Sequence, residues 1–127
     1  AGQTQDYVFG YTILNDVSAR DVQTAHKQWY FGKSLDGFTP IGPCIVTADE
    51  FADYPPKLGI RSFVNGEKRQ DSNTTLQIFD IDHVIAELSQ GMTLKAGTII
   101  ATGTPAGVGM GMDPPQSKAY PACNMPL

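Results

Sequence analysis

A β-hairpin is predicted most clearly by the stretch Leu58-Gly-Ile-Arg-Ser-Phe-Val-Asn-Gly-Glu-Lys-Arg-Gln70. Asn65-Gly66 favours a two-residue type I′ turn, because both central positions of that turn need a positive φ, which Asn and Gly tolerate. We expect the segments on either side of the turn, 58–64 and 67–70, to pair as antiparallel strands.

The segment that follows the hairpin predicts a helix over residues 80–90. Its apolar residues recur with helical spacing, at Ile81, Val84, Ile85 and Leu88. Asp80 or Asp82 suits the N-terminus of this helix, and Gly91 suits its C-terminal cap.

Three segments of different composition follow this helix. The run Thr98-Ile-Ile-Ala101 predicts a strand, which leads into the glycine-rich segment 103–109. Residues 113–127 are rich in proline and follow neither the helical nor the strand period. We therefore expect a domain over residues 1–112 and an irregular tail over 113–127.

The region before the hairpin alternates between regular structure and loops. Residues 7–14 are rich in β-branched and aromatic side chains and predict a buried strand. Ser18 could cap a short helix over about residues 19–28. The stretch 29–43 is rich in Gly and Pro and is expected to be a loop, and 41–47 predicts a strand interrupted by Pro43. The pattern as a whole predicts a strand-rich α+β fold.

Composition narrows the class of protein. The chain has 127 residues, of which 41% are hydrophobic and 17% charged, with a formal net charge of −4. This balance is that of one ordinary globular domain, and no basic stripe suggests nucleic acid as a partner. No apolar run approaches the roughly 20 residues that span a bilayer, and no signal peptide is evident, so we expect a cytoplasmic protein without membrane contact. Cys44 and Cys123 are expected to be free thiols.

Polar side chains concentrate in the segment 15–23, directly after the first predicted strand. A capped turn with solvated charges would explain them. Alternatively, Asp16 offers a hard oxygen ligand to a divalent cation, while Arg20 and Gln23, three residues apart on one helical face, hold a carboxylate. The residue types alone leave both interpretations open.

Two further segments carry candidate binding groups. Glycine-rich residues 103–109 lack the ending of a phosphate-binding loop, so they are either a plain turn or a cradle in which backbone N–H groups and the Thr104 hydroxyl bind an anion. Lys33 is either a solvated surface lysine or a cation that stabilises a developing enolate. His26 and His83 lie on predicted helices without an obvious partner, and we assign them no catalytic role.

Four segments, in this order and spacing, resemble the fumarylacetoacetate hydrolase family. They are Gly10-Tyr-Thr-Ile-Leu-Asn-Asp-Val-Ser-Ala-Arg-Asp-Val-Gln23, Gly32-Lys-Ser-Leu-Asp-Gly37, Val64-Asn-Gly-Glu-Lys-Arg-Gln70 and Ile100-Ala-Thr-Gly-Thr-Pro-Ala-Gly-Val-Gly109. The resemblance implies a mixed β-sheet roll with one or two short helices. It also implies a hydrolase, decarboxylase or isomerase that acts on a small 2-oxo carboxylate through a metal-stabilised enolate.

The resemblance further implies roles for individual residues. Asp16 matches a ligand of Mg²⁺ or Mn²⁺, Lys33 matches the active-site lysine, Arg20 and Gln23 match substrate-contacting residues, and Thr104 matches the threonine that binds the substrate carboxylate. The full-length protein is expected to be a homodimer.

The sequence also departs from the family pattern. The family's Glu-x-Glu ligand pair and its His-Glu pair lie upstream of the matching segments, and no Glu-x-Glu occurs here. We therefore expect a fragment that is inactive in isolation. The alternative to an enzyme is a non-catalytic carboxylate-binding or interaction module derived from the same fold.

Overall fold

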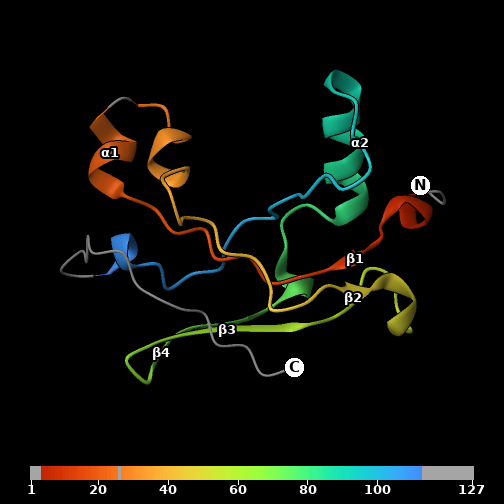
Figure 1. Ribbon diagram of the computed structural model, residues 1–127. Helices are drawn as coiled ribbons and strands as arrows, with labels where there is room; N and C mark the ends of the chain where they lie inside the picture. Colours follow the sequence, from red (N-terminus) through yellow and green to blue (C-terminus); the bar gives the residue numbers. More distant parts are fainter. Residues whose placement is uncertain (1–3, 26, 113–127) are drawn as a thin grey trace.

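The computed structural model describes residues 4–25 and 27–112. Figure 1 shows helix α1 (Arg20–Ala25) and helix α2 (Ile81–Gly91) rising on opposite sides, with the two strand pairs beneath and between them. The α+β class and the presence of two α-helices are confirmed. The expected tail, 113–127, lies outside the described residues.

The predicted hairpin is present. Strand β3 (Gly59–Val64) pairs antiparallel with strand β4 (Glu67–Asn73). The connecting residues have positive φ angles, 51° at Asn65 and 83° at Gly66, as the Asn-Gly turn requires. The hairpin is confirmed. Its register shifts between Ser62 and Phe63, an irregularity that the sequence did not predict.

The predicted second helix is also present, and Asp80 is its N-cap. The Asp80 Oδ1 accepts a hydrogen bond of 2.7 Å from the backbone N–H of His83. This bond satisfies one of the free N–H groups of the first turn. The expected C-terminal boundary is wrong by one residue, because Gly91 is the last helical residue and Met92 is the C-cap.

The predicted strand over 7–14 is mostly absent. A 3₁₀ turn, η1, covers Thr4–Tyr7, and strand β1 contains only Gly10–Tyr11. It pairs antiparallel with strand β2 (Val46–Thr47), and a further bridge joins Leu14 to Ile41. The β-rich composition therefore produces an intermittent ladder, because each strand has a partner along only part of its length.

The strand predicted over 98–101 is wrong. These residues belong to no strand, and Ile99 is 57% exposed. A strand is stabilised by hydrogen bonds to a neighbour. Within the described part of the chain, no strand pairs with this segment.

Short helical turns occupy much of the remaining chain. Helix α1 is shorter than predicted, and His26, expected on it, lies outside the described residues. The predicted loop 29–43 contains the 3₁₀ turn η2 (Phe31–Lys33). The other 3₁₀ turns are η3 (Ala48–Glu50), η4 (Thr74–Leu76) and η5 (Gly109–Gly111).

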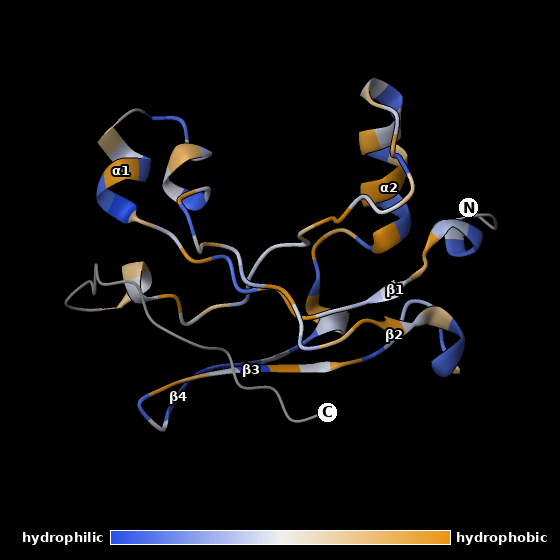
Figure 2. Cartoon of the chain, in the orientation of Figure 1, coloured by the Kyte–Doolittle hydropathy of each residue, from blue (hydrophilic) through white to orange (hydrophobic). Residues whose placement is uncertain are grey.

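Hydrophobic side chains remain accessible across the described chain. None of those in residues 4–25 and 27–112 is fully buried, and Ile78, Tyr7 and Phe9 are 92%, 80% and 75% exposed. Figure 2 shows hydrophobic segments on the strands and on α2. Among the described helices, none is long and apolar enough to cross a membrane.

Candidate active site

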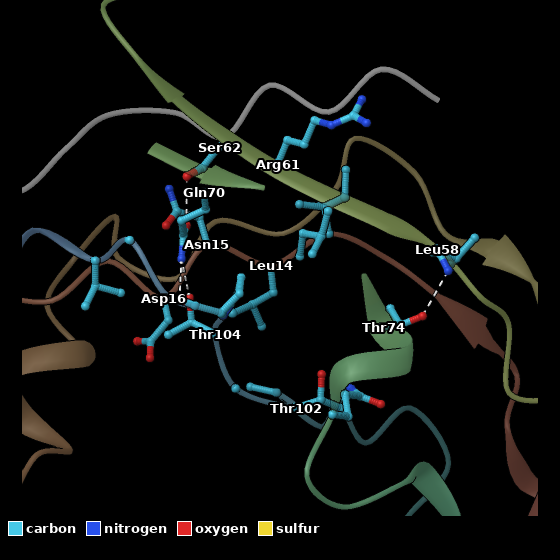
Figure 3. Close-up of a pocket in the computed structure, with 18 of the residues that line it drawn as sticks. Leu14, Asn15, Asp16, Leu58, Arg61, Ser62, Gln70, Thr74, Thr102 and Thr104 are labelled. Carbon is cyan, nitrogen blue, oxygen red and sulfur yellow. Dashed lines mark hydrogen bonds between the residues drawn. The ribbon is translucent and has the colours of Figure 1, made fainter. Parts of the chain in front are cut away.

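A cavity of about 1160 Å³ opens between the strand pairs and the glycine-rich loop. Four of the five residues predicted to form a site line it: Asp16, Arg20, Lys33 and Thr104. They come from three segments that are distant in sequence. Figure 3 shows Asp16 and Thr104 on separate chain segments at this cavity. Gln23 is not among the lining residues.

Lys33 and Asp16 form an ion pair between the Lys33 Nζ and the Asp16 Oδ2. The Lys33 Nζ also donates a hydrogen bond of 3.2 Å to the Ser18 Oγ. The side chains of Lys33 and Asp16 are 25% and 41% exposed, so solvent reaches the pair. The arrangement holds a cation and an anion side by side at the cavity wall, where each is available to a ligand.

Arg20 is oriented by Gln23 on the same face of helix α1. The Arg20 Nη1 donates to the Gln23 Oε1 at 2.7 Å, and Gln23 is only 2% exposed. Gly32 packs against Gln23 so closely that a β-carbon there would lie 2.8 Å from the Gln23 Cβ. In this arrangement the hydrogen bond to Gln23 orients the Arg20 guanidinium. Direct contact between Gln23 and a substrate stays a prediction.

Thr104 is connected to strand β4 by Gln70. The Gln70 Nε2 donates to the Thr104 Oγ1 and to the Pro105 carbonyl oxygen, each at 2.8 Å. The Ser62 hydroxyl donates to the Gln70 Oε1 at 2.7 Å. The sequence gives no sign of this role for Gln70, because its partner Thr104 is 34 positions away.

Two tyrosines at the cavity have altered acidity. Burial is the main cause that raises the pKa of both Tyr54 and Tyr11, and the negative charge of Asp82 adds to it. The Tyr54 hydroxyl also donates to the Asp82 Oδ1 at 2.8 Å. Both phenols therefore stay protonated well above neutral pH and can act as hydrogen-bond donors or acceptors there.

The cavity offers part of the oxygen ligand set that a divalent cation needs. Asp16 presents a half-exposed carboxylate at the cavity, which fits one oxygen ligand of Mg²⁺ or Mn²⁺. Such ions prefer several oxygen ligands, and the residues that the structure describes contain no group of three His, Cys, Asp or Glu side chains suited to a metal. Asp16 thus fits one ligand position, and the described residues do not form a complete site.

Comparison with known proteins identifies relatives over nearly the whole chain. The chain is 52% identical over 111 residues to the oxaloacetate tautomerase YisK of Bacillus subtilis, which covers 87% of this chain and 36% of that protein. It is 53% identical over 105 residues to a protein of Archaeoglobus fulgidus, covering 83% of this chain and 40% of the relative.

Solved structures give the same result for the fold. A fumarylacetoacetate hydrolase from Exiguobacterium antarcticum is 54% identical with a TM-score of 0.84, over 90% of this chain and 40% of that structure. The 5-carboxymethyl-2-hydroxymuconate delta-isomerase from Mycobacterium smegmatis is 45% identical with a TM-score of 0.76, over 83% of this chain and 40% of that one.

The match to the family extends across almost all of the sequence. The family model described as fumarylacetoacetate (FAA) hydrolase C-terminal matches residues 1–122. The chain spans only about 36–40% of the length of these curated relatives. With the matching fold and the four motifs in order, the chain belongs to the fumarylacetoacetate hydrolase family.

Proposed function

We propose that the full-length protein carrying this chain is a metal-dependent enzyme that acts on small 2-oxo carboxylates. The reaction is hydrolysis of the C–C bond of an acylpyruvate, decarboxylation of an oxaloacetate-type acid, or isomerisation of a related enol. One observation carries the proposal: Asp16, Arg20, Lys33 and Thr104, which come from three segments distant in sequence, line the same cavity.

The names of the relatives support this substrate class. Oxaloacetate is a 2-oxo dicarboxylate, and a relative that is 52% identical is a tautomerase of it. A second relative is an isomerase of a hydroxymuconate. Tautomerisation and isomerisation of such acids both pass through an enol or enolate, and this chemistry is common to all three proposed reactions.

Each polar residue at the cavity has a chemical task in the proposal. Arg20 and the Thr104 hydroxyl bind the substrate carboxylate by charge-assisted hydrogen bonds. The Lys33 ammonium stabilises the negative charge that develops on the enolate oxygen. Gln23 holds the Arg20 guanidinium, since its Oε1 accepts from the Arg20 Nη1 at 2.7 Å.

Mg²⁺ or Mn²⁺ is the proposed cofactor, and Asp16 is the residue of this chain that would hold it. When bound, such an ion supplies Lewis-acid polarisation of the 2-oxo group. We propose that further carboxylate ligands come from segments of the full-length protein outside this chain. A cytoplasmic homodimer is the proposed state of that protein, and sedimentation velocity at low micromolar concentration tests it.

The experiment measures turnover of oxaloacetate and of an acylpyruvate by the full-length protein, followed through the enol absorbance. We expect turnover that requires added magnesium or manganese and stops with a chelator. A protein that binds oxalate, an analogue of the enolate, but turns over neither substrate would be the non-catalytic binding module instead. Turnover that resists chelation would contradict the metal-dependent mechanism.

A further inference from the structure

The side chain of Gln70 joins the hairpin to the glycine-rich loop. Gln70 lies on β4 opposite Ser62, and the next pair along the ladder is Phe63 with Lys68. Arg69 is therefore an extra residue on β4, which makes a β-bulge. A bulge re-aims the side chains beside it and is often found next to binding sites.

The partners of Gln70 allow only one orientation of its amide. The Pro105 carbonyl oxygen can only accept a hydrogen bond, so the group facing it at 2.8 Å must be the Gln70 Nε2. The same nitrogen donates its other hydrogen to the Thr104 Oγ1 at 2.8 Å. The Gln70 Oε1 then faces Ser62, whose hydroxyl donates at 2.7 Å. Figure 3 shows these bonds as dashed lines.

The backbone of the glycine-rich loop is also held close to β4. A β-carbon added at Gly107 would overlap the carbonyl oxygen of Arg69. Gly107 has a φ of 106°, a conformation that favours glycine. The backbone of the loop therefore lies directly against the backbone of β4. The Gln70 amide donates to the Thr104 hydroxyl of this loop and so fixes that hydroxyl as an acceptor toward Gln70.

This geometry has a consequence for Thr104. A hydroxyl group has one hydrogen to donate. The Thr104 oxygen already accepts from Gln70, and within the described chain its hydrogen has no acceptor. Thr104 lines the cavity, so its hydrogen is available to an acceptor placed there. A carboxylate oxygen is such an acceptor, whereas an ammonium group is not.

We propose that Gln70 is a positioning residue that makes the Thr104 hydroxyl a hydrogen-bond donor toward an anionic oxygen in the cavity. Gln70 acts through Thr104 and favours ligands that present an acceptor oxygen, such as a carboxylate, over cationic ligands. The proposal rests on the proposed function, from which it takes the carboxylate as the ligand of Thr104.

The most informative variant of the full-length protein is Gln70→Glu. A carboxylate at this position can only accept, so the Thr104 hydroxyl must donate to it and turn away from the cavity, while the Pro105 carbonyl loses its donor. We expect the KM for oxaloacetate to rise about tenfold or more, because a hydrogen bond to a charged group is lost, and kcat to change much less. Gln90→Glu places the same added charge on an exposed part of α2, beside Glu87, and is the control.

A double variant separates positioning from a general structural role. Thr104→Val removes the hydroxyl and keeps the shape of the side chain. If Gln70 acts through Thr104, adding Gln70→Glu to Thr104→Val should raise KM little further, so the two effects are not multiplicative. Independent, multiplicative effects would overturn the proposal, as would a wild-type KM in Gln70→Glu. If Gln70→Glu does not fold, Gln70→Met removes the amide at similar volume and should raise KM in the same direction by a smaller factor, because the Thr104 hydroxyl then loses only the donor that orients it.

Calorimetric titration with oxalate keeps this inference separate from the proposed reaction. If the wild-type protein turns over no 2-oxo acid, the proposed reaction fails, yet Gln70→Glu should still weaken oxalate binding about tenfold through the loss of the Thr104 donor. Equal oxalate affinity in wild type and Gln70→Glu would overturn the role of Gln70. Absence of oxalate binding by the wild-type protein at millimolar concentration would overturn it too.

Discussion

The ammonium group of Lys33 is paired with the carboxylate of Asp16, seventeen positions earlier in the chain. The 3₁₀ turn Phe31–Lys33 packs beside helix α1, and the backbone N–H of Ala19 donates to the Gly32 carbonyl oxygen at 2.8 Å. This packing brings the proposed metal ligand and the proposed catalytic cation to one place. A change at either residue is therefore expected to affect the other.

Replacing Lys33 with alanine tests its role in the chemical step. If the ammonium stabilises an enolate, Lys33→Ala in the full-length protein should lower kcat by roughly 100-fold and raise KM less. Lys95→Ala removes an exposed lysine that does not line the cavity and should leave both constants near wild type. A variant in which only KM moves would show that Lys33 binds substrate without assisting the reaction.

A methyl group at Gly32 should disturb the support of Arg20. The new Cβ would lie 2.8 Å from the Gln23 Cβ and 2.9 Å from the Ala19 carbonyl oxygen. Such overpacking lowers the free energy of unfolding by about 1–3 kcal/mol, and the shift of Gln23 should also weaken substrate binding. Gly91→Ala is the control, because nothing lies within 4 Å of its Cβ. Chemical denaturation that finds Gly32→Ala as stable as Gly91→Ala would contradict the close packing.

Tyr54 provides a dependence of stability on pH. Its pKa is raised by burial and by its hydrogen bond to Asp82. A raised pKa in the folded state gives a contribution that is complete below the ordinary tyrosine value of about 10 and is lost as the pH rises above it. Spectrophotometric titration should show Tyr11 and Tyr54 ionising later than an ordinary tyrosine, and one of these late steps should be missing in Tyr54→Phe.

Asp82→Asn is the companion variant for Tyr54. It removes the negative charge and keeps an oxygen that can accept the Tyr54 hydrogen bond. The phenol should then ionise at a lower pH than in wild type, although burial continues to raise its pKa. An unchanged titration curve would show that Asp82 does not contribute.

The isolated chain of 127 residues should show no turnover of oxaloacetate or acylpyruvates. Asp16 is the one ligand that matches the family pattern, and millimolar magnesium cannot replace carboxylates that the chain does not contain. Oxalate should bind poorly, and the accessible hydrophobic side chains should bind a fluorescent apolar dye. Metal-dependent turnover by the isolated chain would show that other carboxylates, such as Asp21 or Asp36, complete the site.

Local signals in the sequence predicted the elements that depend on local interactions. Asn65-Gly66 determines its own turn through backbone conformations that few residues tolerate, and Asp80 caps the helix that follows it. The strands were predicted less well. Residues 98–101 have strand-forming side chains, but a strand needs a neighbour, and the composition of a segment does not reveal whether one is present.

The sequence indicated candidate residues of the site, but not the contacts that position them. Asp16, Arg20, Lys33 and Thr104 were identified through the family resemblance, and all four line the cavity. The hydrogen bond from Gln70 to Thr104 spans 34 positions and depends on a bulge in β4, which no local pattern indicates. The burial of Gln23 was missed for the same reason, because it results from the approach of Gly32 in three dimensions.

The magnesium dependence of turnover in Asp16→Asn tests the central claim most directly. The full-length wild type and the variant are assayed with oxaloacetate while magnesium is titrated from the micromolar to the millimolar range. Loss of an anionic ligand weakens such a site by orders of magnitude, so the variant should be inactive at magnesium concentrations that saturate the wild type, with its thermal unfolding unchanged. Equal turnover of the two proteins at limiting magnesium would contradict the assignment of Asp16 as a metal ligand.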